Sequence, residues 1–355
     1  MKPHNFSAGP SILPEEVFKQ AAESIHNFAG TGLSILEVSH RGPQFVEVME
    51  NAMSLVRELL GLPDNYHVMF LTGGASTQFF MTVMNMLPKD KIGYYIDTGT
   101  WSKKAIKEAK MFGTINVLAS SSDSNYNFIP KPDPLPDSGQ FLHITSNNTI
   151  FGTQYQEWPK TNMPIICDAS SDIFSRPMPI EKFGCIYAGA QKNMGPAGTT
   201  LVIVREDMLD QVDRQIPTML NYRTHIAKDS AFNTPPVFPI YVSMLVMEWV
   251  KKQGGLNAMQ QINEDKAKVL YDAIDNSSLF EGTAAVEDRS RMNVTFVCKD
   301  DSRTQAFMEL LKKENISGLK GHRSVGGFRA SIYNAMPKSS VEHLINVMQA
   351  FEANS

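Results

Sequence analysis

The sequence predicts an α/β fold, with a large domain built on a mostly parallel sheet and a smaller α+β domain after it. Between residues 66 and 168, short apolar runs typical of strands alternate with longer runs of helical spacing. Repeated strand–helix units favour a parallel sheet that is covered by helices on both faces. At 355 residues the chain is also longer than one hydrophobic core usually organises. We therefore expect two domains, residues 14–255 and 256–355, with the boundary beside Gly254 and Gly255.

Two helices are expected before the first strand of the sheet. Pro14 is a suitable first residue for one of them, and apolar residues recur after it at helical spacing until Gly30 and Gly32 end the pattern. Pro43 begins the second helix, whose apolar residues again share one side, and Gly61 ends it.

The sheet is predicted from short apolar runs that are bounded by turn residues. The first five strands are expected over residues 66–71, 92–97, 114–118, 141–145 and 164–168. Two more flank a stretch rich in glycine and alanine: a short one that begins at Gly184, and one over residues 199–204. Helices over residues 78–87 and 101–112 connect several of these strands.

The pattern changes on either side of the last predicted strands of the sheet. Residues 120–139 are poor in apolar side chains and are expected to form mostly surface loop. A short helix after Arg205 leads into residues 217–239, which show little periodicity, and a segment this long without regular structure usually carries function. The remainder reads as α+β, with helices over residues 240–253, 256–275, 303–314 and 340–351 and strands over 293–297 and 328–333.

The composition excludes several classes of function. An apolar fraction of 42% with 20% charged residues is ordinary for a soluble globular protein. The net charge of −4, without a basic tract, gives no support for nucleic-acid binding. Three cysteines without paired spacing argue against a disulfide framework or a metal site. Because no apolar run suits a signal peptide or a membrane span, we expect a cytoplasmic protein.

Lys192 and Asp168 suggest the chemistry. Lys192 lies between two predicted strands, among small residues that let a bound molecule approach the backbone. Asp168 ends the preceding strand, and open α/β sheets bind ligands beyond the carboxyl ends of their strands. Enzymes that use pyridoxal 5′-phosphate (PLP) need such a pair: an amine that forms a Schiff base with the aldehyde, and a carboxylate that keeps the pyridine nitrogen protonated. We therefore predict PLP on Lys192 with Asp168 behind its ring.

A glycine-rich turn is a candidate site for the PLP phosphate. The sequence from Thr72 to Thr77 joins a predicted strand to a predicted helix. Free N–H groups at such a helix start favour a phosphate. The turn lacks the GK[ST] ending of a P-loop, so nucleotide binding fits poorly.

Two histidine–arginine pairs suggest a further anion site. His40 and Arg41 precede a predicted helix, and His322 and Arg323 lie in a glycine-rich loop that leads to Arg329. Arginine binds phosphates and carboxylates in a forked geometry that lysine cannot match.

The same motifs resemble those of the phosphoserine aminotransferases, over essentially the whole chain. The stretches that carry the resemblance are NFSAGP from Asn5, DASS from Asp168, SRP from Ser175, YAGAQKN from Tyr187, GPAG from Gly195 and ASIYNAMP from Ala330. The resemblance implies the fold of type I aminotransferases, with a seven-stranded-type sheet and with residues 1–13 joined to the small domain.

The resemblance also implies roles for single residues. Ala75, Ser76 and Gln191 match phosphate ligands of PLP, Trp101 matches the residue that stacks on its ring, and Thr149 the residue that binds its 3′-oxygen. Some members of the family carry arginine where this chain has Ser76.

Further residues match the substrate site and a subunit contact. His40, Arg41, His322 and Arg323 match the residues that bind the distal anion of the substrate, and Arg329 the one that binds its α-carboxylate. Asn233 and Thr234 match a pair that reaches the PLP phosphate of the neighbouring subunit, so a homodimer is implied.

The implied activity is the reversible transamination between 3-phosphohydroxypyruvate with glutamate and phosphoserine with 2-oxoglutarate, a step of serine biosynthesis. The extent of activity on a 4-phosphohydroxythreonine-type substrate of pyridoxine biosynthesis stays open. Two alternatives within PLP enzymes, another aminotransferase and a desulfurase, also stay open. A third alternative is a phosphate- or dinucleotide-binding module that uses no PLP.

Overall fold

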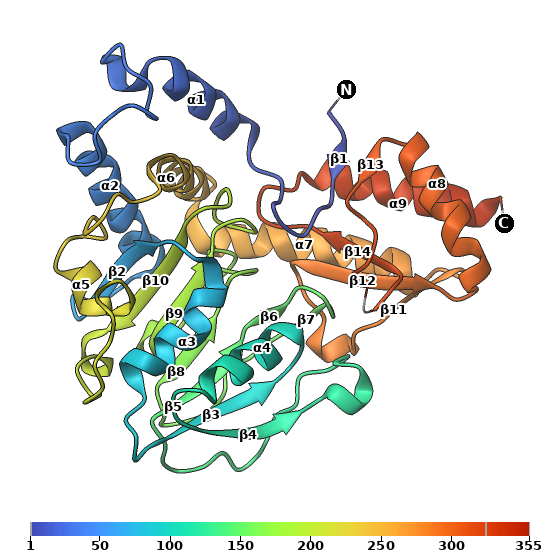
Figure 1. Ribbon diagram of the computed structural model, residues 1–355. Helices are drawn as coiled ribbons and strands as arrows, with labels where there is room; N and C mark the ends of the chain where they lie inside the picture. The colour runs from blue at the N-terminus through green and yellow to red at the C-terminus, as the bar shows by residue number, and fades with distance from the viewer. Residues whose placement is uncertain (1, 324, 355) are drawn as a thin grey trace.

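The computed structural model describes residues 2–323 and 325–354, and its centre is a seven-stranded sheet (Figure 1). The strands of this sheet lie in the order β2 (Tyr66–Leu71), β10 (Thr200–Arg205), β9 (Phe183–Gly189), β8 (Ile165–Asp168), β5 (Phe141–Thr145), β3 (Ile92–Asp97) and β4 (Thr114–Ser120). Strand β10 runs antiparallel to both of its neighbours, whereas the pairs from β9 through β4 are parallel. The predicted α/β class and mostly parallel sheet are confirmed.

Helices cover both faces of the sheet. Helices α1, α2 and α6 pack together on one face, and α3 and α4 pack together on the other (Figure 1). The helices span α1 (Glu15–His26), α2 (Pro43–Leu60), α3 (Gly74–Met86), α4 (Thr100–Ala109), α5 (Tyr222–Ile226), α6 (Val237–Lys252), α7 (Gly255–Asp275), α8 (Thr304–Lys313) and α9 (Lys338–Ala353). None of the helices in the described residues is long and apolar enough to cross a membrane.

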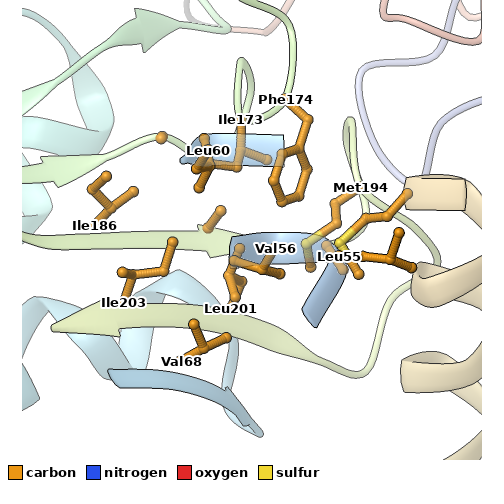
Figure 2. Packing of buried hydrophobic residues seen from close by; sticks show 14 of the residues in the cluster. Leu55, Val56, Leu60, Val68, Ile173, Phe174, Ile186, Met194, Leu201 and Ile203 are labelled. Carbon is orange, nitrogen blue, oxygen red and sulfur yellow. The ribbon is translucent and has the colours of Figure 1, made fainter. Parts of the chain in front are cut away.

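The core beneath β9 and β10 supports the turn that carries Lys192. Leu55, Val56 and Leu60 come from one side of α2, and they face apolar residues of the sheet such as Leu201 (Figure 2). Met194 lies in the same cluster and is fully buried. Because Met194 follows Lys192 by two positions, burial of its side chain holds the turn against the sheet.

The C-terminal region has a second core around a three-stranded antiparallel sheet. This sheet has the order β11 (Phe280–Gly282), β12 (Asn293–Cys298) and β14 (Phe328–Ser331). Strand β1 (His4–Asn5) pairs with β13 (Ile316–Ser317), and Phe6 is buried in this second core. The hairpin of β6 (Asn147–Asn148) and β7 (Thr153–Gln154) leaves the large sheet after β5.

Some elements differ from the sequence prediction. The predicted structureless segment over residues 217–239 contains α5, whose start is capped because the side chain of Asn221 accepts a hydrogen bond from the Arg223 N–H. Helix α3 begins at Gly74, four residues before the prediction, because the two glycines take left-handed conformations that lead directly into the helix. The short strands β1, β11 and β13 were not predicted.

Candidate active site

Lys192 lies beyond the end of β9, in the turn to β10. Its Nζ atom donates a hydrogen bond to the hydroxyl of Thr149, 2.6 Å away, and lies 5.3 Å from the centre of the Trp101 ring. Burial lowers the pKa of the Lys192 amine to about 8, while the negative charge of Asp168 opposes this shift. The amine is therefore partly deprotonated near neutral pH, unlike an ordinary lysine.

Asp168 is the last residue of β8, the strand beside β9. Its buried carboxylate accepts hydrogen bonds from Ser170, at 3.0 Å from the N–H and 2.6 Å from the hydroxyl. Burial raises the pKa of Asp168, and the bond from the Ser170 hydroxyl and the charge of Lys192 oppose the rise. The carboxylate is thus held in place, and a cationic partner would keep it ionised.

Thr149 joins the lysine to Arg329 of the C-terminal region. Its hydroxyl contacts Lys192, and its carbonyl oxygen accepts a 3.5 Å hydrogen bond from Nη1 of Arg329. The Nε atom of Arg329 and the indole Nε1 of Trp101 are buried without a hydrogen-bond partner in the part of the chain that the structure describes. Donors of this kind point to a bound molecule, since buried polar groups are rarely left unpaired.

The start of α3 offers an anion site. Gly73 and Gly74 have φ values of +94° and +67°, and among the described residues no side chain caps the helix. A Cβ atom on Gly73 would lie 2.0 Å from the hydroxyl oxygen of Thr77, so only glycine fits there. The first N–H groups of the helix, including those of Ala75 and Ser76, are therefore available to a phosphate.

These groups fit PLP. Lys192 has the reactive amine, Thr149 a hydroxyl for the 3′-oxygen, and Asp168 the carboxylate for the pyridine nitrogen. Trp101 presents its aromatic face beside the amine. Gln191 is half-buried next to Lys192, and its carbonyl oxygen accepts a hydrogen bond from the Ser11 N–H.

Arg329 also belongs to a cluster of positive charge. Residues 318–327 connect β13 to β14 and contain His322 and Arg323. The pKa of His322 is lowered by burial and then by the charges of Arg329, Arg323 and Lys104. Four basic side chains from two regions of the chain thus share one neighbourhood.

Two predicted pairs lie away from these residues. His40 and Arg41 are in the loop before α2, where Arg41 is exposed and the Nε2 atom of His40 is buried without a partner in residues 2–323 and 325–354. Asn233 and Thr234 are exposed just before α6. Within the described parts, neither pair forms a hydrogen bond or ion pair with Lys192.

The loop of Asn233 does meet the start of α3 in the same chain. Asn233 lines a cavity of about 170 Å³ together with Gly73 and Thr77. Helix α2, which follows His40 and Arg41, packs on α6, which follows Asn233 and Thr234 (Figure 1).

The sequence prediction missed a polar network behind Trp101. Asp97 ends β3, and its carboxylate accepts hydrogen bonds from Ser102 and Ser120 at 2.9 Å each and from Tyr126 at 3.1 Å. The Ser102 hydroxyl also accepts bonds from two N–H groups in the turn before α4. An aspartate at the end of a predicted strand, the pattern that pointed to Asp168, could have identified it.

The cysteines do not suit a desulfurase, which needs a catalytic cysteine in a mobile loop. Cys167, Cys185 and Cys298 all lie in strands, and all three are buried free thiols. Burial raises the pKa of each thiol, which disfavours the reactive thiolate.

Comparison with known proteins identifies the family of the chain. The family model for class-V aminotransferases matches residues 4–344. The phosphoserine aminotransferase of Flavobacterium johnsoniae is 55% identical over 354 residues, 99% of each chain, and that of Parabacteroides distasonis is also 55% identical over 99% of each chain.

Solved structures show the same fold. The phosphoserine aminotransferase from Bacillus circulans subsp. alkalophilus superposes with a TM-score of 0.96 at 46% identity, covering 99% of each chain. A structure of a phosphoserine aminotransferase that describes radiation damage of its Schiff base reaches 0.97 at 48% identity over 100% of each chain. The chain therefore belongs to the class-V aminotransferases, and among them to the phosphoserine aminotransferase family.

Proposed function

We propose that this chain transfers the amino group reversibly between glutamate and 3-phosphohydroxypyruvate, which gives phosphoserine and 2-oxoglutarate and serves serine biosynthesis. The observation that carries the proposal is the contact of one residue, Thr149, with both Lys192 and Arg329. Through Thr149, the reactive amine of Lys192 and the guanidinium of Arg329, which can bind a carboxylate, lie close to each other. The relatives named above are phosphoserine aminotransferases, which supports the same substrates.

PLP bound at Lys192 would supply an electron sink for negative charge at the α-carbon of the substrate. Lys192 is then the group that moves the proton. Nζ would become a free amine when the substrate amine replaces it, and its lowered pKa, about 8 in this structure, would leave part of it neutral at physiological pH to take the proton from the α-carbon. The Thr149 hydroxyl and the Trp101 ring limit the positions that Nζ can take.

Arg329 and the basic cluster bind the two ends of the substrate. Arg329 is half-buried and its Nε donor has no partner among the described residues, which suits a forked contact with the α-carboxylate. His322 and Arg323 lie beyond it, where the phosphate of phosphoserine or the side-chain carboxylate of glutamate would bind. His40 and Arg41 join the same anion in the proposal, as the family resemblance implies.

A spectrum tests the cofactor and the reaction class. The purified protein should absorb visible light, and added glutamate should shift the absorbance without a keto acid acceptor, because the first half-reaction needs only the amino donor. Phosphoserine should give the same shift, whereas serine should react far more slowly because it leaves the cations unpaired. A colourless protein would instead favour the phosphate-binding module.

We also propose a homodimer in which Asn233 and Thr234 reach the PLP phosphate of the neighbouring subunit. Both side chains are exposed, and Phe232 beside them is 42% exposed. Covering this exposed apolar ring with a second subunit would be favourable, because it removes apolar surface from water. A two-fold dimer makes such an exchange reciprocal.

Complementation distinguishes this arrangement from contact within one chain, which the cavity shared by Asn233 and Gly73 also permits. A Lys192→Ala chain and an Asn233→Ala/Thr234→Ala chain are inactive alone and are mixed, unfolded mildly and refolded together. Activity returns if the loop acts on the neighbouring site, because one site of the mixed dimer is then whole. If the loop acts on its own site, the mixture stays as inactive as its parents.

The buried free cysteines support a reducing compartment, and we assign the enzyme to the cytoplasm. A reporter fused to the chain should stay in the cytoplasm, and export of the fusion would contradict this assignment.

A further inference from the structure

Lys104 is a basic residue of the active-site region to which no role has been given above. It lies one turn after Trp101 on α4, and residues three apart on a helix share one face. Its Nζ atom is 4.6 Å from the centre of the Trp101 ring. The ring that lies beside the catalytic amine therefore also holds the Lys104 ammonium in place, by a cation–π contact.

The loop with the second histidine–arginine pair lies over the same end of α4. Val325 of this loop and Trp101 both pack against one small apolar cluster, which contains Phe151. The charge of Lys104 is one of the causes that lower the pKa of His322. The side chain thus lies within electrostatic reach of the cluster that the proposed function assigns to the distal anion.

Lys104 also borders the start of α3. A groove of about 420 Å³ is lined by Ser76 and Thr77 of α3 and by Lys104, Lys107 and Glu108 of α4. In the part of the chain that the structure describes, no carboxylate forms an ion pair with Lys104, although Glu108 lines the same groove.

We propose that Lys104 is a specificity-determining residue, which adds a positive charge at the phosphate end of the substrate and so favours phosphoserine over glutamate. This inference rests on the proposed transamination of phosphoserine. A phosphate monoester carries a charge of about −1.5 to −2 at neutral pH, whereas the side chain of glutamate carries one negative charge. An additional cation attracts the phosphate more strongly, because the energy scales with the product of the charges.

The expected size of the effect follows from the exposure of the lysine. Lys104 is exposed, so water and salt weaken its attraction for the substrate. We expect Lys104→Met to raise the KM for phosphoserine about three- to fivefold and that for glutamate less than twofold, with little change in kcat. Lys104→Arg keeps the charge and should restore most of the affinity.

Lys103→Met is the matched control, because it removes the same charge from the neighbouring exposed position of α4. The second measurement needs no turnover: calorimetric binding of 3-phosphoglycerate to the PLP-loaded enzyme. This compound has a carboxylate and a phosphate but no amine or oxo group to react. The Kd of 3-phosphoglycerate should rise in Lys104→Met but not in Lys103→Met. The difference in Kd between Lys104→Met and the wild-type enzyme should shrink at high salt.

The outcomes separate the two levels of the proposal. If wild-type enzyme does not transaminate phosphoserine, the proposed function fails. If it does and Lys104→Met behaves as Lys103→Met in both measurements, the inference about Lys104 is wrong. An equal loss with phosphoserine and glutamate would also overturn it, since the lysine would then act through Trp101 and not on the phosphate.

Discussion

At the scale of single residues, the site depends on how burial changes the charge of a few groups. Burial favours the neutral form of Lys192 and disfavours the ionised form of Asp168. PLP can reconcile the two, because its ring nitrogen offers a cation to the carboxylate and its aldehyde consumes the amine. The structure around them, chiefly Ser170 and Thr149, keeps both groups in position until the cofactor arrives.

The pKa of Lys192 predicts how fast the cofactor-free enzyme takes up PLP at different pH values. Only the neutral amine attacks an aldehyde, so the rate should rise with pH and level off above a midpoint of about 8. The measurement is stopped-flow absorbance with cofactor-free protein. A rate that continues to rise towards pH 10 would show an ordinary lysine and contradict the low pKa.

Asp168→Asn keeps the size of the side chain but removes its charge. The hydrogen bonds from Ser170 can still form, so we expect the variant to fold and to bind PLP. Transamination should slow by at least about a hundredfold, because the pyridine nitrogen loses the anion that keeps it protonated. Single-turnover kinetics with glutamate measure the loss. Near-normal turnover would contradict the proposed role of Asp168 in keeping the pyridine nitrogen protonated.

At the scale of elements, the ends of strands and the starts of helices carry the site. Lys192, Asp168 and Asp97 follow or end strands of one sheet, and the proposed phosphate site is the start of α3. Such positions are visible in a sequence, since a charged or glycine-rich residue interrupts an apolar run. Strands β2, β3 and β5 were therefore predicted to the residue.

Other elements leave no such signal. The strands β1 and β13 have two residues each and form only because they pair across the whole chain. The burial of Lys266 is equally hard to predict from the sequence. It stands among charged residues of α7 and looks like part of an exposed helix face. Yet it is fully buried, because its Nζ atom donates hydrogen bonds to backbone carbonyls of a distant segment.

A pair of glycine substitutions tests the start of α3. Gly73→Ala places a Cβ 2.0 Å from the Thr77 oxygen, whereas around a Cβ on Gly74 nothing lies within 4 Å. Both changes force alanine into a left-handed conformation, which costs about 1–2 kcal/mol. Gly73→Ala should lose clearly more stability than Gly74→Ala, together with PLP affinity. Urea unfolding and PLP titration measure both, and equal losses would show that the turn can relax.

At the scale of the whole molecule, α7 joins the two regions that meet at the active site. Lys266 of α7 donates hydrogen bonds to the carbonyls of Ile332 and Tyr333, at 3.0 and 2.7 Å. The next residue, Asn334, donates its N–H to the side chain of Asn193, 2.9 Å away. The segment that carries Arg329 is thereby tied to the turn of Lys192. The division into two domains at residue 255 stays a prediction.

Lys266→Met tests this tie. The change leaves buried carbonyls unpaired and should cost about 3 kcal/mol of unfolding free energy. Burial lowers the pKa of Lys266 to about 7, below that of the unfolded chain, so the unfolded state binds more protons between pH 7 and about 10.4. This residue therefore makes wild-type enzyme more stable as pH rises, and the deficit of the variant should grow from pH 7 to 9.

Lys268→Met is the control, because Lys268 lies on the same helix with 72% of its side chain exposed. Urea unfolding at each pH gives both differences. A deficit of Lys266→Met that shrinks or stays constant over this range would contradict the lowered pKa.

The pairing of β1 with the C-terminal region sets an order of events in time. His4 bonds to Ser340, 336 positions along the chain, and the Ser11 hydroxyl donates to the carbonyl of Lys192. At a translation rate of about 5–20 residues per second, the segment around His4 waits for tens of seconds before its partners leave the ribosome. Phe6, whose ring packs in the second core, lacks its partners there, residues 267–348, during that wait. The pairing of β1 with β13 can thus form only when synthesis is nearly over, so the N-terminal segment is among the last parts of the chain to find its place.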